Sequence, residues 1–211
     1  MMHAAVYANT DQEQVIRFNQ SSYFEQDSDQ QYFEQLLRLA LQETIDDFGP
    51  FKLQPVTINM VQARALSMLQ ANEHVDVMWT MTSIARERDL QAVYIPLLKG
   101  LMGYRVFLIR KGEQARFNDI ESLDALFQLR AGQGASWPDT AVLEYYHFPM
   151  YQSVGSLLYG MLEKRRFDYF PRAITEVLKE IEHYPQFQIE QKLMLRYFSP
   201  TYFFVNKSNQ G

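Results

Sequence analysis

The pattern of apolar and polar positions is clearest over residues 75–111. Residues 75–81 form a nearly continuous apolar run, which is typical of a strand covered on both faces of a parallel sheet. The pattern then predicts a polar turn with a short helix over residues 82–89, and further strands over 90–95 and 104–110. In open α/β sheets, ligands bind beyond the carboxyl ends of the strands. The polar residues that follow the first run are therefore candidates for a ligand site.

The residues before this stretch also alternate between strand and helix patterns. Strands are predicted over residues 14–20 and 51–58, and a helix between them is expected to have its cap within residues 27–29. This helix should stop at Gly49, which precedes a proline. Asn59 is expected to cap the next helix. The order of strand, helix, strand, helix and strand predicts right-handed crossovers and a parallel sheet.

After residue 104 the alternation begins again. Helices are predicted over residues 118–129, 138–146, 155–163 and 171–183, and extended segments over 130–132, 167–170, 188–197 and 201–205. Ser122 or Asp119 can cap the first of these helices, and Pro171 suits the first turn of the last one. The repeated pattern predicts an α/β protein that forms either one domain or two lobes of about 100 residues each.

Composition narrows the class of protein. Of the 211 residues, 47% are apolar and 21% are charged, which indicates a folded globular chain. The formal net charge of -5 argues against a nucleic-acid partner. The chain has no cysteine, and its four histidines are scattered, so we expect no disulfide, no metal site and no cofactor. No apolar run reaches the roughly 18 residues of a membrane span.

A family resemblance becomes visible over residues 76–88, Asp-Val-Met-Trp-Thr-Met-Thr-Ser-Ile-Ala-Arg-Glu-Arg. This segment resembles one in the type II periplasmic solute-binding proteins, which bind amino acids and other small polar solutes for ABC importers. The resemblance implies a two-lobed α/β fold in which each lobe is a mostly parallel sheet flanked by helices. It implies a first lobe over residues 9–98, joined by 201–211, a second lobe over 105–198, and a hinge made by residues 95–105 and 199–204.

The resemblance also implies a location and partners. We expect a periplasmic protein that binds a small-molecule ligand and works with an ABC transporter permease or a membrane sensor. Residues 4–8 look like the end of a signal peptide whose apolar part is missing, although an irregular N-terminus is the alternative. Family members continue with helices after the strand equivalent to residues 201–205. A chain without those helices is expected to expose an apolar patch or to self-associate.

In the family, hydroxyl groups and an arginine grip the carboxylate of the ligand. The matching hydroxyl residues here are Thr80, Thr82 and Ser83, and the alternative for Thr82 and Ser83 is helix capping. Arg88 matches the arginine, with Arg86 as its substitute because register errors of about two residues are normal. The alternative for Arg88 is a solvated side chain paired with a neighbouring carboxylate.

Further candidates lie beside the predicted turns. Trp79 and Trp137 can form an aromatic plate over a ligand, or can simply pack in the core. The glycine-rich turn over residues 132–136 can offer free backbone N–H groups to an anion. Asp139 follows in the first turn of a helix, where it can cap the helix or contact a ligand amine.

Tyr169 and Arg172 lie in the region where amino-acid-binding members of the family place the carboxylate that holds the ligand's α-amino group. That carboxylate is missing here. An arginine in the first turn of a helix calls for an anionic partner. The ligand is therefore predicted to be an anion without an α-amino group, whereas the alternative is a surface pair of Arg172 with Glu176.

Two other functions remain open from the sequence. One is an enzyme on the same scaffold, such as a dehydratase-like lyase acting on a small carboxylate, for which Asp139, Glu87 and Asp168 are the nearby acids or bases. No recognisable motif positions any of these three carboxylates. The other is an interaction module that binds no small molecule.

Overall fold

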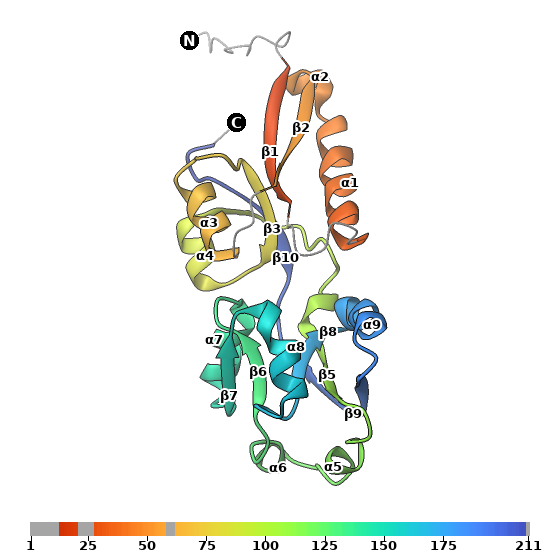
Figure 1. Cartoon of the computed structure of the whole chain (residues 1–211). Helices are drawn as coiled ribbons and strands as arrows, with labels where there is room; N and C mark the ends of the chain where they lie inside the picture. Colours follow the sequence, from red (N-terminus) through yellow and green to blue (C-terminus); the bar gives the residue numbers. More distant parts are fainter. Residues whose placement is uncertain (1–12, 21–27, 58–61, 210–211) are drawn as a thin grey trace. The chain divides into compact units, whose positions relative to one another are not determined.

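The computed structural model divides the chain into two compact units (Figure 1). The structure describes residues 13–20, 28–57 and 62–209. Unit 1 comprises Met1–Thr80, Ile84–Ile95 and Tyr202–Gly211, and unit 2 comprises Met81–Ser83 and Pro96–Thr201. The expected cleavage site at residues 4–8, the cap residue Asp27 and the cap residue Asn59 lie outside the described residues. The hinge stays a prediction.

Unit 1 is built on a five-stranded sheet in the order β2-β1-β3-β10-β4. Its strands are β1 (Gln14–Gln20), β2 (Phe51–Thr57), β3 (Val77–Met81), β4 (Gln91–Val93) and β10 (Thr201–Val205). β1 pairs in parallel with β2 and with β3, as the alternating pattern predicts. β10 returns from the far end of the chain and pairs antiparallel with β4.

Among the described residues, four helices accompany this sheet: α1 (Ser28–Gln42), α2 (Ile45–Phe48), α3 (Gln62–Gln70) and α4 (Ile84–Asp89). α3 buries Ala65 and Leu69 in a core that also contains Val75 and Phe204. The side-chain amide of Asn206 donates hydrogen bonds to the carbonyls of Leu69 and Gln70. These carbonyls end α3, where helical partners run out, so Asn206 stabilises the helix terminus.

An ion pair between Arg17 and Asp76 joins β1 to the residue before β3. The Arg17 backbone N and Nε each donate to Oδ2 of Asp76 at 2.8 Å, and Nη2 donates to Oδ1 at 2.6 Å. Partial burial raises the pKa of Asp76, but the hydrogen bonds from Arg17 outweigh it and leave the pKa below its ordinary value.

This ion pair predicts a measurable dependence of stability on pH. Because the native pKa of Asp76 is depressed, its contribution should be present above about pH 4 and be lost as the pH falls through the native pKa. Asp76→Asn should lower the free energy of unfolding by about 1 kcal/mol at neutral pH and flatten the acid side of the profile. Urea unfolding at several pH values measures both effects. An unchanged acid slope in the variant would contradict the prediction.

Unit 2 contains an antiparallel sheet in the order β8-β5-β9 and a parallel pair of strands, β6 and β7. The strands are β5 (Tyr104–Arg110), β6 (Ala131–Gly134), β7 (Met150–Ser153), β8 (Phe170–Ala173) and β9 (Phe187–Arg196). The mostly parallel sheet expected for this lobe therefore holds in part: β6 pairs in parallel with β7, and an isolated parallel bridge joins Ala131 to Tyr169, whereas β5 pairs antiparallel with β8 and β9. An apolar run looks the same in a buried strand of either direction, so the pattern located β5 but not the direction of its neighbours.

The helices of unit 2 are η2 (Leu101–Gly103), α5 (Ala115–Asn118), α6 (Leu123–Leu126), α7 (Pro138–Tyr145), α8 (Gly155–Glu163) and α9 (Ile174–His183). The single helix predicted over residues 118–129 is wrong. α5 ends at Asn118, so α6 alone lies inside that range, and Ser122 caps α6 as expected by accepting a hydrogen bond from the backbone N of Ala125. In the described part of the chain, no helix is long and apolar enough to cross a membrane.

The expected position of Pro171 is also wrong. It lies inside β8, opposite Phe107 of β5, and α9 begins three residues later at Ile174. β8 is at the edge of its sheet, where the missing N–H of a proline is tolerated.

β5 is buried on both faces. Phe107 and Ile109 belong to one core cluster of unit 2, whereas Leu108 belongs to another. Alternate residues of a strand point to opposite faces, so β5 separates the two clusters. This agrees with the continuous apolar pattern from which the strand was predicted.

Candidate functional site

In unit 1, the carboxyl end of β3 and the helix α4 bring together Thr80 and Arg86. The Arg86 side chain donates to Oγ1 of Thr80 at 2.5 Å and to Oε1 of Gln62, the first residue of α3, at 2.6 Å. Arg86 is only 8% exposed. Arg88 is exposed, and its guanidinium bonds both carboxylate oxygens of Asp89 at 2.7 and 2.9 Å. Residues two apart on a helix do not share a face, so only Arg86 is held beside the end of β3.

Trp79 lies in an aromatic cluster of unit 1. Its ring centroid is 5.6 Å from those of Phe18 and Phe33 and 6.3 Å from that of Phe203. These contacts are those of the core-packing alternative. The remaining hydroxyl candidates, Thr82 and Ser83, belong to unit 2, and the backbone N of Thr82 donates to the carbonyl of Pro200 at 2.9 Å. Their role in ligand binding stays a prediction.

In unit 2, Asp139 forms a buried ion pair with Arg105. The distance between Nη2 of Arg105 and Oδ1 of Asp139 is 2.8 Å, and the side chains are 3% and 5% exposed. The hydroxyl of Tyr197 donates to the same carboxylate. Burial raises the pKa of Tyr197, and the negative charge of Asp139 raises it further. Asp139 therefore has two side-chain partners within unit 2, and neither of the roles considered for it, helix cap or amine contact, accounts for them.

Arg172 forms a second buried ion pair with Glu180. Its Nε donates to both carboxylate oxygens of Glu180 at 2.9 Å, and its Nη2 donates to one of them as well. Nη2 also lies 2.8 Å from a carboxylate oxygen of Glu176. The guanidinium carbon is 4.8 Å from the ring centroid of Trp137 and 5.0 Å from that of Phe170. A guanidinium against aromatic faces is a favourable cation–π arrangement.

These contacts correct the expectation for Arg172. It lies in β8 and not in the first turn of a helix, and it is a buried guanidinium, not a surface one, although its partner Glu176 is half-buried. The anionic partner that the sequence called for is supplied by two carboxylates of α9. Burial lowers the pKa of Arg172, but Glu176 and Glu180 outweigh it and hold the pKa well above its ordinary value. The guanidinium is therefore charged and compensated inside unit 2.

The glycine-rich turn after β6 has fewer free donors than expected. The N–H groups of Gly132, Gly134, Ala135 and Trp137 donate to Tyr169 O, Gln133 Oε1, Ser153 O and Gly134 O. Packing explains the glycines: a Cβ on Gly132 would lie 2.2 Å from the Phe167 ring, and one on Gly134 would lie 2.4 Å from the Trp137 ring. An anion site made of these four N–H groups is therefore wrong for this turn.

Tyr169 is a core residue in the structure. It is completely buried, and its ring centroid is 4.5 Å from that of Phe107 and 6.3 Å from that of Phe117. Burial raises the pKa of its hydroxyl. A ligand contact by Tyr169 would require the core of unit 2 to open.

Sequence reasoning named Glu176 as a partner of Arg172 but missed the other partners that hold these side chains, which are Gln62, Arg105, Glu180 and Tyr197. One signal was available: Arg105 interrupts the apolar strand over residues 104–110. A charged side chain in a strand buried on both faces requires a buried partner. The other three, Gln62, Glu180 and Tyr197, are ordinary polar residues, and nothing in the local sequence distinguishes them.

Comparison with known proteins shows which fold the chain shares with solved structures. Neither a protein-family model nor a curated protein sequence matches the chain. Among solved structures, a putative L-cystine ABC transporter protein from Listeria monocytogenes matches with a TM-score of 0.63 and 16% identity, over 93% of this chain and 84% of that one. A cysteine-binding protein from Campylobacter jejuni matches with a TM-score of 0.60 and 15% identity, over 93% and 78%.

A third solved structure, a periplasmic binding protein of Salmonella typhimurium with high arginine specificity, matches with a TM-score of 0.64 and 12% identity, over 93% and 87%. At these identities the likeness shows the fold. The chain has the two-lobed α/β fold of periplasmic solute-binding proteins, which confirms the fold class that the resemblance of residues 76–88 implied.

Proposed function

We propose that this chain is an extracytoplasmic solute-binding protein that holds a small polar solute carrying a carboxylate, for an ABC importer or a sensory system. The fold supports this proposal, as do the solved structures of similar fold that are named for binding arginine or cysteine. Both of those solutes are amino acids and carry a carboxylate.

The observation that carries the proposal is the buried contact between Arg86 and Thr80 at the carboxyl end of β3. Ligands of open α/β sheets bind beyond this end of the strands. A guanidinium offers two parallel donors that match the two oxygens of a carboxylate, and a neighbouring hydroxyl adds a further donor. Arg86 was one of the two arginines that the resemblance placed in the ligand site.

The proposal differs from the sequence-based prediction in its view of the ligand's amino group. Arg172 was the reason to expect that an α-amino group is excluded. The cluster around it contains two arginines, Arg105 and Arg172, and three carboxylates, Asp139, Glu176 and Glu180. Since its negative charges outnumber the positive ones, this cluster gives no reason for a ligand ammonium to be repelled. The proposal therefore keeps the carboxylate and drops the exclusion of amino acids.

A ligand screen followed by two matched variants tests the proposal. The screen measures thermal stability with amino acids, their des-amino analogues, dicarboxylates and short peptides. A true ligand at about 100 times its dissociation constant should stabilise the chain by about 2.7 kcal/mol. Arg86→Lys should then weaken binding of that ligand about tenfold or more in calorimetry, because a lysine cannot make the paired donation of the guanidinium.

Arg88→Lys is the control, since it makes the same substitution two residues away on an exposed side chain. It should leave the affinity within about twofold. If Arg88→Lys weakens binding and Arg86→Lys does not, the assignment of Arg86 is wrong. If the solute is chemically converted during the titration, the chain is an enzyme and the proposed function fails.

A further inference from the structure

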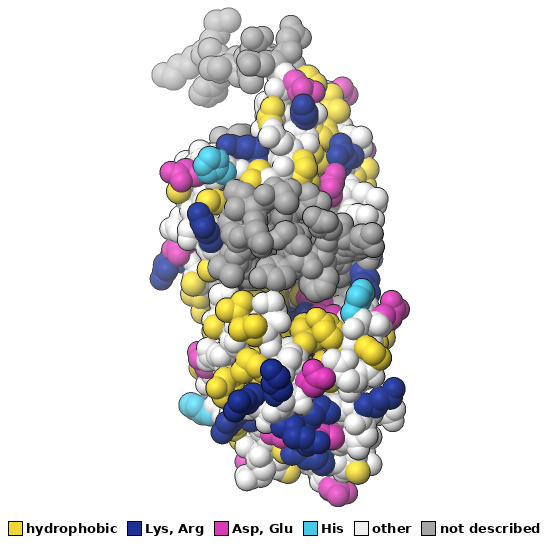
Figure 2. Space-filling view, in the orientation of Figure 1, with side chains coloured by type: hydrophobic (Ala, Val, Ile, Leu, Met, Phe, Trp, Pro, Cys, Tyr) yellow, Lys and Arg dark blue, Asp and Glu magenta, His cyan; other side chains and the backbone are white. Residues whose placement is uncertain are grey.

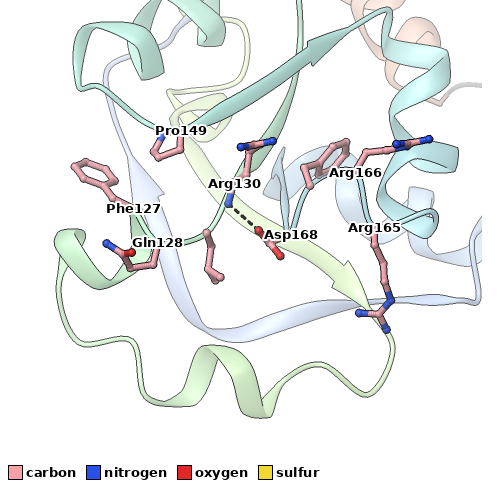
Figure 3. A pocket seen from close by; sticks show the side chains of 9 residues that line it. Phe127, Gln128, Arg130, Pro149, Arg165, Arg166 and Asp168 are labelled. Atoms are coloured by element: carbon pink, nitrogen blue, oxygen red, sulfur yellow. Dashed lines mark hydrogen bonds between the residues drawn. The ribbon is translucent and has the colours of Figure 1, made fainter.

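Unit 2 carries a basic pocket that the proposed function does not use. The pocket has a volume of about 320 Å³ and is lined by Phe127, Gln128, Leu129, Arg130, Pro149, Arg165, Arg166, Phe167 and Asp168 (Figure 3). We call it the arginine pocket. Lys and Arg side chains gather on the surface of unit 2 in Figure 2, although the whole chain has a net charge of -5.

Three arginines saturate the first carboxylate near the pocket, that of Glu113. Its oxygens lie 2.8 Å from Nη2 of Arg110, 3.2 Å from Nη1 of Arg116 and 2.6 Å from Nη1 of Arg165. Arg110 and Glu113 are buried, and the exposed side chains of Arg116 and Arg165 contact the Glu113 carboxylate from the surface. A carboxylate that already has three guanidinium partners cannot neutralise further ones.

The second carboxylate, that of Asp168, also has a partner at each of its two oxygens. One oxygen lies 2.8 Å from Nη2 of Arg116, and the other accepts the backbone N–H of Arg130 at 2.8 Å (Figure 3). In the described part of the chain, no hydrogen bond or ion pair is made by the side chains of Arg130 and Arg166, and both are exposed. Five arginines thus surround two carboxylates, which leaves an excess of three positive charges.

Backbone hydrogen bonds tie the chain to its neighbours at both exposed arginines. The carbonyl of Arg130 accepts from the backbone N of Asp168 at 2.7 Å, and the backbone N of Arg166 donates to the carbonyl of Met161 at 3.0 Å. Below them, the buried guanidinium of Arg110 donates to the carbonyl of Phe167 at 2.8 Å. In the described part of the chain neither of these two side chains is already paired, so no ion pair has to be broken before a partner binds.

The arrangement favours an extended partner over a small ion. Figure 3 shows the guanidinium groups of Arg130, Arg165 and Arg166 spread around the pocket and pointing in different directions. A chain with several carboxylates can meet groups that point in different directions, whereas a small anion presents its charge at one point. Half-buried apolar side chains, including Phe127 and Leu129, also line the pocket. Arginine and aromatic residues are the types enriched in protein interfaces.

We propose that the arginine pocket is a docking surface for an acidic segment of a partner protein, one that carries several Asp or Glu residues with an apolar residue among them. This surface is separate from the residues assigned to the solute. Its function does not depend on which solute the chain binds. Charge complementarity would also steer the encounter, so the association rate should fall as the salt concentration rises.

A binding experiment with a defined acidic peptide tests the proposal. The probe is a fluorescein-labelled peptide of about eight residues, mostly glutamate with two leucines, and fluorescence anisotropy reports its binding to the full chain. Replacing both exposed arginines, Arg130→Gln with Arg166→Gln, should weaken binding about tenfold. The control, Lys52→Gln with Arg64→Gln, removes two exposed positive charges from unit 1 and should change binding by no more than about twofold.

Two results would overturn the proposal. An equal loss in both double variants would show that the peptide responds to net charge and not to this pocket. Citrate that displaces the peptide far better than sodium chloride of equal ionic strength would identify a small-anion site in place of a docking surface. Because all four substituted side chains are exposed, the melting temperatures of both double variants should stay near that of the unmodified chain.

Discussion

Replacing Arg172 with methionine is expected to lower the free energy of unfolding of unit 2 by about 3–5 kcal/mol. Methionine has a similar length and no charge, so the main loss is the ion pair with Glu180 and Glu176. Glu180 is buried and would keep a charge with no guanidinium beside it. The variant also loses the contact of the guanidinium with Trp137. Breaking one half of a buried pair is costly because the desolvation of the other half is no longer offset.

A double variant separates the charge from the packing. Arg172→Met combined with Glu180→Leu removes both charges and should recover most of the lost stability, because an apolar pair of similar volume needs no desolvation. Glu176→Gln is a milder control, since Glu176 is more exposed than Glu180. Its cost should be about 1 kcal/mol.

Urea unfolding followed by tryptophan fluorescence measures the free energy of unfolding of unit 2 in each variant. Each unit contains one of the two tryptophans, Trp79 in unit 1 and Trp137 in unit 2. A Trp79→Phe background makes the signal specific to unit 2, which matters because the units can unfold separately. A loss below about 1 kcal/mol for Arg172→Met would show that Glu180 is solvated in the native protein.

The second large effect is expected at Gly103, just before β5. A Cβ at this position would lie 2.1 Å from the carbonyl oxygen of Tyr197, which is a backbone atom and cannot rotate away. The backbone N of Tyr197 also donates to the carbonyl of Gly103 at 3.1 Å, so the two segments approach closely and are bonded together. Gly103→Ala should therefore lower the free energy of unfolding by about 3 kcal/mol or more.

Gly100 is the matched control for Gly103. It has a φ of +84°, and a Cβ there would meet no atom within 4 Å. Gly100→Ala should cost only about 1–2 kcal/mol, the penalty for placing a side chain on a left-handed backbone. Thermal and urea unfolding of both variants give the comparison. If the two variants lose the same amount, the close approach at Gly103 is relieved by a small backbone shift and the prediction fails.

These two glycines also show how sequence and structure differ in what they explain. Both lie within residues 95–105, part of the hinge that the resemblance implies, and glycine torsions change at low cost. The structure gives each a different reason: a left-handed backbone at Gly100 and a close backbone contact at Gly103. A close contact between residues about 90 positions apart leaves no mark on the local pattern.

The elements that the sequence predicted well are those set by local periodicity. The strand over residues 104–110 and the helix over 155–163 have the bounds that the pattern indicated. The alternation before residue 95 identified β1 to β4 of unit 1, and β1 pairs in parallel with β2 and β3 as expected. Such patterns are readable because a strand or helix repeats its buried positions every two or about 3.6 residues.

The candidate site was readable only in part. The residues after β3 were identified from their type and order, but Arg86 and Arg88 are two positions apart and look alike in the sequence. The structure separates them because Gln62, on another helix, contacts Arg86, whereas Asp89 binds Arg88 at the surface. The choice depends on a contact between α3 and α4, which only the folded chain makes.

The sequence by itself determined the α/β class, the position of most strands and helices, and the resemblance of residues 76–88 to a solute-binding segment. The tertiary structure decided which buried charges pair with one another. Arg172 looked like a cation in need of an anionic ligand, and folding places Glu180 against it from eight residues further along the chain, on a different element. Burial and hydrophobic periodicity are repeated along the chain and can be read locally. The partner of a buried charge is set by which elements pack together, and that is determined only when the chain folds.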